Sequence, residues 1–395
     1  MVSPATQPTR ISVLALGSGI TLLGVLRSLS KSGFDVYALP DVDDLPRRSR
    51  WYRPAPSAFA GVQGENLVGA LSSLPTRTVL LPCSDYWVTA VAGLSSSVRE
   101  KYPASVPPSE ALRTLVDKAE FRASLTRLSL PHPRTRVVSK TSDLDGIPDD
   151  VLRQSFLKPA HSQQFFAHFG VKAFRISDRQ DACIRLSACT AAGFEMMLQE
   201  YIPGPATSHF FLDGFIDRHG IRRALFARQR LRMSPPDFGN STSMISVPTE
   251  RVASGVATLE KLFADIKFRG VFSAEFKRDE RDGSLKLIEV NARPWWYVEF
   301  AARCGVNVCE MAVRDALGED VTTVGEYETG RRCVFPYYDF EAVRAEIREH
   351  RMNSTAWVRS WIGPYQPVFR WTDVWPAFGG IALLLRRRLK RTFTA

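Results

Sequence analysis

Residues 272–277 read FSAEFK and residues 286–293 read KLIEVNAR, and these two stretches decide the fold. In both, apolar and polar residues alternate as they do in short β-strands. The polar segment between them contains Asp282-Gly283, a dipeptide typical of tight turns. The sequence therefore predicts a β-hairpin.

The hairpin carries a candidate metal site. Glu289, Asn291 and Arg293 are two residues apart, so they share one face of their strand. If the register places Glu275 on that face, two carboxylates and an amide lie together, which suits Mg²⁺ bound to phosphates. A cation would also relieve the repulsion between the carboxylates, and Arg293 would add a fork for an anion. The simpler alternative is a solvated face of alternating charges, but the matching Glu275 favours a metal site.

The same residues carry a family resemblance. Residues 272–293 resemble the metal-binding end of the ATP-grasp superfamily, and their E-x-N-x-R pattern is similar to that of carbamoyl phosphate synthetase-like members. The resemblance implies that Glu275, Glu289 and Asn291 hold Mg²⁺ against the phosphates of ATP. It also implies that Arg293 steadies the phosphoryl group that is transferred.

Earlier motifs resemble the nucleotide site of the same superfamily, in the same order. They are D-K-x-x-F at 117–121, L-K-P at 157–159 and Q-E-Y-I-P-G at 199–204. The resemblance implies that Lys118 and Lys158 contact the phosphates, with Lys172 as a further candidate. It implies that the hinge against the adenosine is formed by Glu200, Tyr201 and Ile202.

One segment departs from the family pattern. Where the family has a glycine-rich flap over the phosphates, residues 160–170 contain a single glycine and several aromatic residues. We expect a bulky loop that closes over a ligand but brings few backbone amides close to phosphate.

Three arginines alternate along another predicted strand, at positions 228, 230 and 232. A solvated edge strand protected by charge is one interpretation. The other is an anion-binding face opposite the triphosphate. On the second interpretation we expect Arg293, Arg230 and Arg228 to be the catalytic cations.

Composition places the chain among ordinary globular proteins. Its 395 residues are enough for two or three domains. Of these residues 45% are hydrophobic and 24% are charged, as in soluble globular proteins. The net charge is +11, and much of the excess lies in residues 386–391 and not in a basic stripe with interleaved aromatics. Such an excess suits an anionic membrane surface or anionic substrates such as nucleotides, and its distribution leads us to expect no nucleic-acid partner.

Cysteine usage and hydropathy indicate a cytoplasmic protein. The six cysteines are scattered without a C-x-x-C pair, so the sequence predicts neither a zinc site nor a disulfide framework. The start of the chain lacks the pattern of a secretory signal, and we expect no segment that spans a bilayer.

The chain opens with a βαβ pattern over residues 11–39, typical of a small doubly wound α/β domain. Its turn, Gly17-Ser18-Gly19, matches a dinucleotide-binding fingerprint incompletely, because the third glycine would fall at Leu22. A tight turn before a helix N-terminus open to an anion is better supported. An α/β dehydrogenase stays open as an alternative.

The end of the chain has the composition of an interfacial helix. Residues 371–391 combine Trp371 and Trp375 with the apolar stretch 381–385 and the basic run 386–391. We expect peripheral contact with an anionic membrane, at its inner surface, without crossing. A basic helix packed on its own domain is the alternative.

The resemblance extends over about residues 10–320 and implies an α/β architecture. We expect an ATP-grasp fold preceded by a small doubly wound α/β domain and followed by a C-terminal helical extension. The expected domains are residues 1–108, residues 109–325 with a lid at about 135–203, and residues 326–395 with the basic tail.

The resemblance also implies a reaction. A carboxylate attacks the γ-phosphate of ATP, and an amine then displaces phosphate from the acylphosphate to form an amide. ATP and Mg²⁺ are the implied cofactors, a small-molecule carboxylate and an amine are the implied partners, and a homodimer is a further expectation. The alternative is a non-catalytic ATP-binding protein recruited to membranes. ADP release in the presence of a carboxylate and an amine would separate these two functions, and thermal shifts with ATP·Mg or NAD would separate the ligase from the dehydrogenase.

Overall fold

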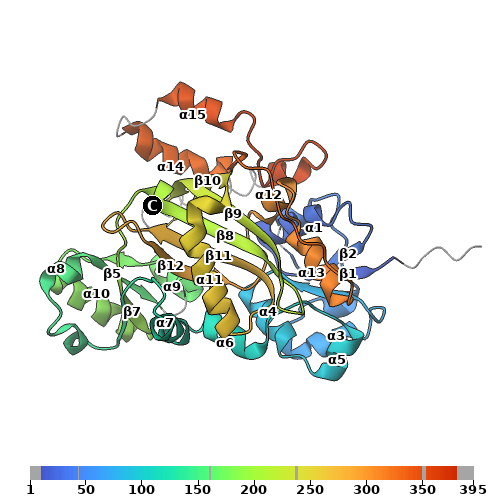
Figure 1. Cartoon of the computed structure of the whole chain (residues 1–395), viewed down its shortest axis with the longest axis horizontal. Coiled ribbons are helices and arrows are strands. Elements are labelled where there is room, and N and C mark those ends of the chain that lie inside the picture. The colour runs from blue at the N-terminus through green and yellow to red at the C-terminus, as the bar shows by residue number, and fades with distance from the viewer. Residues whose placement is uncertain (1–9, 43, 160–161, 236–238, 349–352, 380–395) are drawn as a thin grey trace, which may run out of the picture.

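The computed structural model describes residues 10–42, 44–159, 162–235, 239–348 and 353–379 (Figure 1). These residues form three β-sheets with helices around them. The basic run 386–391 and the apolar stretch 381–385 lie outside the described residues.

The first sheet is parallel and has the strand order β2–β1–β3. Its strands are β1 (Ser12–Leu16), β2 (Asp35–Ala38) and β3 (Val79–Pro82). Helix α1 (Gly19–Ser28) connects β1 to β2, which confirms the predicted βαβ unit. The other helices of this region are α2 (Asp44–Arg47), α3 (Leu67–Leu71), α4 (Asp85–Ala92) and α5 (Ser96–Lys101).

The second sheet has the order β4–β7–β5–β6 and follows two linking helices, α6 (Ser109–Val116) and α7 (Lys118–Arg127). Its strands are β4 (Thr135–Val138), β5 (Ser155–Pro159), β6 (Phe174–Arg175) and β7 (Met196–Glu200). Helices α8 (Asp149–Arg153), α9 (Ser162–Phe169) and α10 (Arg179–Ala191) accompany it, and together they form the lower left of Figure 1.

Helix α9 corrects the expectation of a bulky loop over residues 160–170. Phe165 of this helix is fully buried, and its ring lies 4.7 Å from that of Phe169, 5.5 Å from that of Phe174 and 5.2 Å from that of Phe194. Phe165 therefore fills the core of this region together with the other three rings, whereas Phe166 is 53% exposed. The rings pack on one another and bury their apolar surface in the protein interior, so they are not available as a cover over a ligand.

The third sheet is central and antiparallel, with the order β12–β11–β8–β9–β10–β13. Its strands are β8 (His209–Ile216), β9 (Arg222–Ser234), β10 (Asn240–Val247), β11 (Gly270–Arg278), β12 (Leu285–Asn291) and β13 (Arg332–Val334). Strands β11 and β12 form the predicted hairpin. Strand β13 belongs to the segment assigned to the C-terminal extension, so that segment shares a hydrogen-bonded strand with the central sheet.

Both faces of the central sheet are covered. Helix α11 (Ala253–Asp265) lies across one face and buries Leu259, Leu262 and Phe263 against it (Figure 1). The other face packs on α12 (Val298–Arg303), α13 (Val308–Ala316) and the parallel sheet of the N-terminal region. The resulting cores fix the sheets that carry the candidate site.

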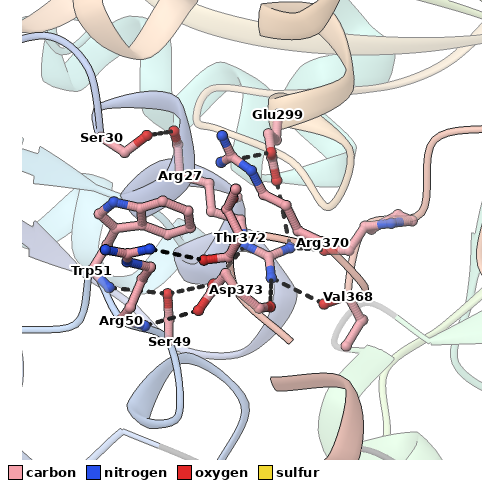
Figure 2. Close-up of polar contacts among 12 residues, drawn as sticks. Arg27, Ser30, Ser49, Arg50, Trp51, Glu299, Val368, Arg370, Thr372 and Asp373 are labelled. Atoms are coloured by element: carbon pink, nitrogen blue, oxygen red, sulfur yellow. Dashed lines mark hydrogen bonds and ion pairs between the residues drawn. The ribbon is translucent and has the colours of Figure 1, made fainter. Parts of the chain in front are cut away.

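The C-terminal extension returns to the start of the chain. After α14 (Pro336–Arg348) and α15 (Ser354–Trp361), residues 368–379, which we call the strap, pack against α1. Asp373 of the strap accepts hydrogen bonds from Arg27 Nε (3.0 Å) and Ser49 Oγ (2.7 Å) (Figure 2). The side chains of Arg27 and Asp373 are both fully buried, so this ion pair joins the two ends of the described chain.

No helix in the described ranges combines the length and the apolar character needed to cross a membrane.

We predict that Asp373→Ala destabilises the protein by about 3 kcal/mol, because it leaves the buried guanidinium of Arg27 without this partner. The thermal unfolding midpoint measures the loss. Asp282→Ala is the matched control, since Asp282 pairs with Lys286 on the exposed hairpin turn and its loss should shift the midpoint much less. Equal shifts in the two variants would contradict a structural role for the buried pair.

Candidate active site

A cleft of about 380 Å³ is lined by residues of the lid and of the central sheet. It brings together eleven of the twelve residues predicted from the sequence. They are Lys158, Lys172, Glu200, Tyr201, Ile202, Arg228, Arg230, Glu275, Glu289, Asn291 and Arg293. The twelfth, Lys118, lines a smaller adjoining cavity together with Lys158.

The two predicted carboxylates face each other. Glu275 on β11 is the direct register partner of Glu289 on β12, so both lie on the same face, as the metal-site interpretation requires. Asn291 continues this face, and its Nδ2 donates to Glu289 Oε1 at 3.2 Å. The pairing thus places two carboxylates and an amide side by side.

Glu275 is balanced by two neighbours. Arg230 Nη2 donates to Glu275 Oε1 at 3.0 Å, and His209 Nδ1 donates to the same oxygen at 2.7 Å. Burial alone would raise the pKa of Glu275, but Arg230 and His209 together hold it well below its ordinary value. Burial lowers the pKa of His209 to about 4 despite this hydrogen bond, so the imidazole is neutral at pH 7.

Two lysines approach the carboxylates from the other side of the cleft. Asp117 caps α7 by accepting hydrogen bonds from the next backbone amides, which places Lys118 at the first helical position. Lys118 Nζ then donates to the backbone carbonyl of Pro159 at 2.8 Å, and Lys158 Nζ donates to Gln199 Oε1 at 3.2 Å. Burial, followed by the charge of Lys158, lowers the pKa of Lys118 to about 8. Burial also lowers the pKa of Lys158.

The predicted hinge residues line the cleft, and the side chains of Glu200 and Tyr201 contact other side chains there. Glu200 Oε1 accepts from Arg281 at 2.6 Å, and Glu200 Oε2 accepts from the backbone N–H of Arg134 at 3.0 Å. Burial would raise the pKa of Glu200, but these hydrogen bonds lower it overall. The ring of Tyr201 lies between two cations, with Arg175 at 3.8 Å and Lys277 at 4.6 Å.

The alternating arginines lie inside the sheet. Strand β9 is flanked by β8 and β10, so the interpretation of a solvated edge strand is wrong. Arg228 is buried, with its Nε 2.6 Å from Asp213 Oδ2 and its guanidinium 3.8 Å from the ring centre of Phe211. Arg232 pairs with Asp339. Arg230 is therefore the member of this set that reaches the facing carboxylates.

Arg293 has a partner that the sequence reasoning missed. Its Nε and Nη2 lie 2.9 Å from Asp85 Oδ1 and Oδ2, in a bidentate ion pair, and Nη2 also donates to Asn291 Oδ1 at 3.1 Å. Asp85 begins α4, directly beyond the carboxyl end of strand β3. Ligands of α/β sheets bind at this end of the strands, so that position was a usable signal. For His209 the sequence held no comparable signal.

Known proteins resemble the chain in sequence and in structure. No protein-family model matches it. A D-aspartate ligase from Enterococcus faecium (strain Aus0004) is 24% identical over 249 residues, which are 60% of this chain and 58% of that protein. The chain thus spans somewhat over half the length of this relative.

Solved structures match over more of the chain. An L-amino acid ligase from Bacillus licheniformis superposes with a TM-score of 0.59 at 16% identity, over 82% of this chain and 79% of that chain. The biotin carboxylase domain of the Hydrogenobacter thermophilus 2-oxoglutarate carboxylase, a dimer in complex with ADP, its magnesium salt and bicarbonate, gives a TM-score of 0.61. Its identity is 15%, over 82% of this chain and 74% of that chain. The chain has the ATP-grasp fold.

Glu275, Glu289 and Asn291 lie side by side in the cleft, and their chemistry fits Mg²⁺. In the part of the chain that the structure describes, no three His, Cys, Asp or Glu side chains form a metal cage by themselves. Mg²⁺ does not need such a cage, because it usually binds one or two carboxylates and completes its shell with water and phosphate oxygens. The three oxygen donors are sufficient for that mode.

We predict that the affinity for ADP falls as the pH rises from 7 to 9. Lys118 with a pKa of about 8 is mostly charged at pH 7, whereas only about a tenth of it is charged at pH 9. The affinity should therefore fall by up to about tenfold if the charged form binds phosphate. Calorimetric titration at several pH values measures it.

Lys118→Arg is the control for this titration, because arginine keeps its charge over the whole range. It should flatten the pH dependence between pH 7 and 9. The same slope in both proteins would contradict a role for the Lys118 ammonium.

Proposed function

We propose that the protein is an ATP- and Mg²⁺-dependent ligase that activates a carboxylate as an acylphosphate and joins it to an amine. The observation that carries this proposal is the facing pair Glu275 and Glu289, with Asn291 beside it, in a cleft lined by lysines and arginines. The ATP-grasp fold and the ligase relative support the same reaction class.

Each part of the cleft has a role in this proposal. Glu275, Glu289 and Asn291 would hold Mg²⁺, which neutralises the β- and γ-phosphates when bound. The lysines at 118, 158 and 172 would hold the phosphate chain. The adenosine would lie against the hinge of Glu200, Tyr201 and Ile202.

The catalytic cations lie on both sides of the carboxylate pair. Arg230 contacts Glu275, and Arg293 contacts Asn291. Both can therefore donate to oxygens of the transferring phosphoryl group, where charge develops. Arg228 is buried and paired with Asp213, so we assign it a positioning role.

The two half-reactions balance without a protein nucleophile. An oxygen of the substrate carboxylate attacks the γ-phosphorus, and the bond to ADP breaks. The lone pair of the amine attacks the acyl carbon, the carbon–oxygen bond to phosphate breaks, and the amine loses a proton. Inorganic phosphate thus leaves with an oxygen that came from the carboxylate.

Amino acids are the first carboxylates to test. The relative is named as a D-aspartate ligase, and one structural neighbour is named as an L-amino acid ligase. ADP release with D-aspartate and other amino acids, with hydroxylamine as a general amine, tests the proposal directly. ATP binding without carboxylate-dependent ADP release would support the non-catalytic alternative.

The remaining expectations stay proposals. They are the domain limits at 1–108, 109–325 and 326–395, a homodimer, and peripheral contact with an anionic membrane through residues 371–391. A biotin carboxylase neighbour is described as a dimer, which is a reason to test whether this chain forms a homodimer. Membrane contact would bring the ligase close to amines carried on lipids.

We predict that Glu289→Gln lowers ADP formation at least about 100-fold, because it removes one anionic ligand of the metal. The unfolding midpoint should stay close to that of the wild type, since Glu289 lies on the exposed side of the cleft. Glu260→Gln, which changes an exposed glutamate paired with Arg222 outside the cleft, is the matched control. Near-normal turnover in folded Glu289→Gln protein would refute the metal assignment.

We predict that Lys158→Ala raises the apparent KM for ATP by about tenfold or more, because a charged donor to phosphate is lost. The KM for the carboxylate should change much less. Steady-state kinetics with each substrate varied in turn measure the two effects. Lys101→Ala, an exposed change on α5 outside the cleft, should alter neither value. An unchanged KM for ATP in Lys158→Ala would make Lys158 a structural lysine.

A further inference from the structure

The strap of residues 368–379 has two different faces. On its inner face Val368, Asp373 and Ala377 are buried. On its outer face Trp371 is 86% exposed and Trp375 is 64% exposed, and Phe378 is exposed by 57%. The strap thus presents three large aromatic side chains to solvent.

The inner face locks this orientation. The guanidinium of Arg27 donates to Asp373 and to the backbone carbonyls of Pro367 (2.8 Å) and Val368 (3.0 Å) (Figure 2). The carboxylate of Asp373 also accepts from the backbone N–H of Arg50 at 2.9 Å. Turning the strap over to bury the tryptophans would break this buried network, so their exposure is part of the fold.

Arginines from a distant segment lie beside the aromatic residues. Arg50 Nη1 donates to the carbonyl of Thr372 at 3.3 Å (Figure 2). Gly379 lies so close to the side chain of Arg48 that a Cβ on this glycine would meet it at 2.4 Å. Arg48 and Arg50 are both exposed. The fold therefore combines cations of the N-terminal region with aromatic residues of the C-terminal strap, which is not visible in the sequence.

Single exposed apolar side chains are common, but a locked aromatic group beside arginines is typical of an interface. The charge of the chain at and beyond the strap favours one kind of partner. Residues 374–395, which include the end of the strap and the chain beyond it, contain no Asp or Glu and five lysines or arginines. Tryptophan at headgroup level together with clustered cations is the chemistry that binds an anionic bilayer.

We propose that the outer face of the strap, with Arg48 and Arg50, is a docking surface for an anionic lipid bilayer. No step of the ligase reaction is needed for this contact. Val368 and Ala377 of the strap form one hydrophobic cluster with Ile20 and Phe335, and Trp296, which lines the cleft, packs against this cluster.

The test uses the full chain and vesicles of phosphatidylcholine, with or without phosphatidylglycerol. The wild type should co-sediment with the anionic vesicles only, and the binding should weaken as salt is added. Changing Trp371, Trp375 and Phe378 together to alanine should lower binding at least about tenfold. Arg48→Gln should lower it about fivefold at low salt.

A matched control changes exposed apolar residues elsewhere, namely Val137, Ile184 and Ile221, to alanine, and should bind as the wild type does. A chain that ends at residue 379 should keep part of its binding, because the described surface remains. Thermal midpoints confirm that each variant is folded. ADP release with soluble substrates should not change in the aromatic variant, so failure here and failure of the ligase proposal are separate results.

Three results would overturn the proposal. The first is no binding of the wild type to anionic vesicles at low salt. The second is equal binding by the aromatic variant. The third is a dimer of the wild type in sedimentation velocity that the aromatic variant converts to a monomer without vesicles, because the surface would then belong to a second copy of the chain.

Discussion

The direct pairing of Glu275 with Glu289 is the constraint on which the rest of the cleft depends. Like charges placed opposite each other across an antiparallel pair destabilise a sheet, and burial adds to the cost. Neighbouring groups offset this repulsion between the two carboxylates. Arg230 and neutral His209 contact Glu275, and the charge of Lys158 lies near both carboxylates. The cations of the cleft therefore stabilise the fold before any ligand arrives.

The same balance explains why the free cleft is suited to a metal and an anion together. Burial lowers the pKa of Lys118 and Lys158 although Glu289 lies near both. The carboxylates nearby therefore do not fully offset the cost of burying the two ammonium groups. Phosphate would supply further negative charge, and Mg²⁺ would supply positive charge to the facing carboxylates. Phosphate alone would leave the charge of the facing carboxylates without this compensation, and Mg²⁺ alone would leave the charge of the lysines without it. Asp85 of the N-terminal region forms an ion pair with Arg293, so the charges of the cleft also interact with the region of the first sheet.

The sequence predicted those features that depend on local spacing. The hairpin, the shared face of Glu289 and Asn291, and the opening βαβ unit follow from periods of two and of about four residues. Partners that are distant along the chain could not be predicted in this way, and Asp373, 346 residues from Arg27, is the clearest case. The aromatic run around Phe165 was misinterpreted because packing partners, not composition, decide whether such a run covers a ligand or fills a core.

The transfer of isotope from a labelled carboxylate tests the central claim most directly. The protein is incubated with MgATP, hydroxylamine and amino acids whose carboxylates carry oxygen-18, beginning with D-aspartate. With an acylphosphate intermediate, ADP, hydroxamate and inorganic phosphate form in equal amounts and each phosphate carries one labelled oxygen. Phosphate without label, or ADP release that does not depend on any carboxylate, would contradict an acylphosphate-forming ligase.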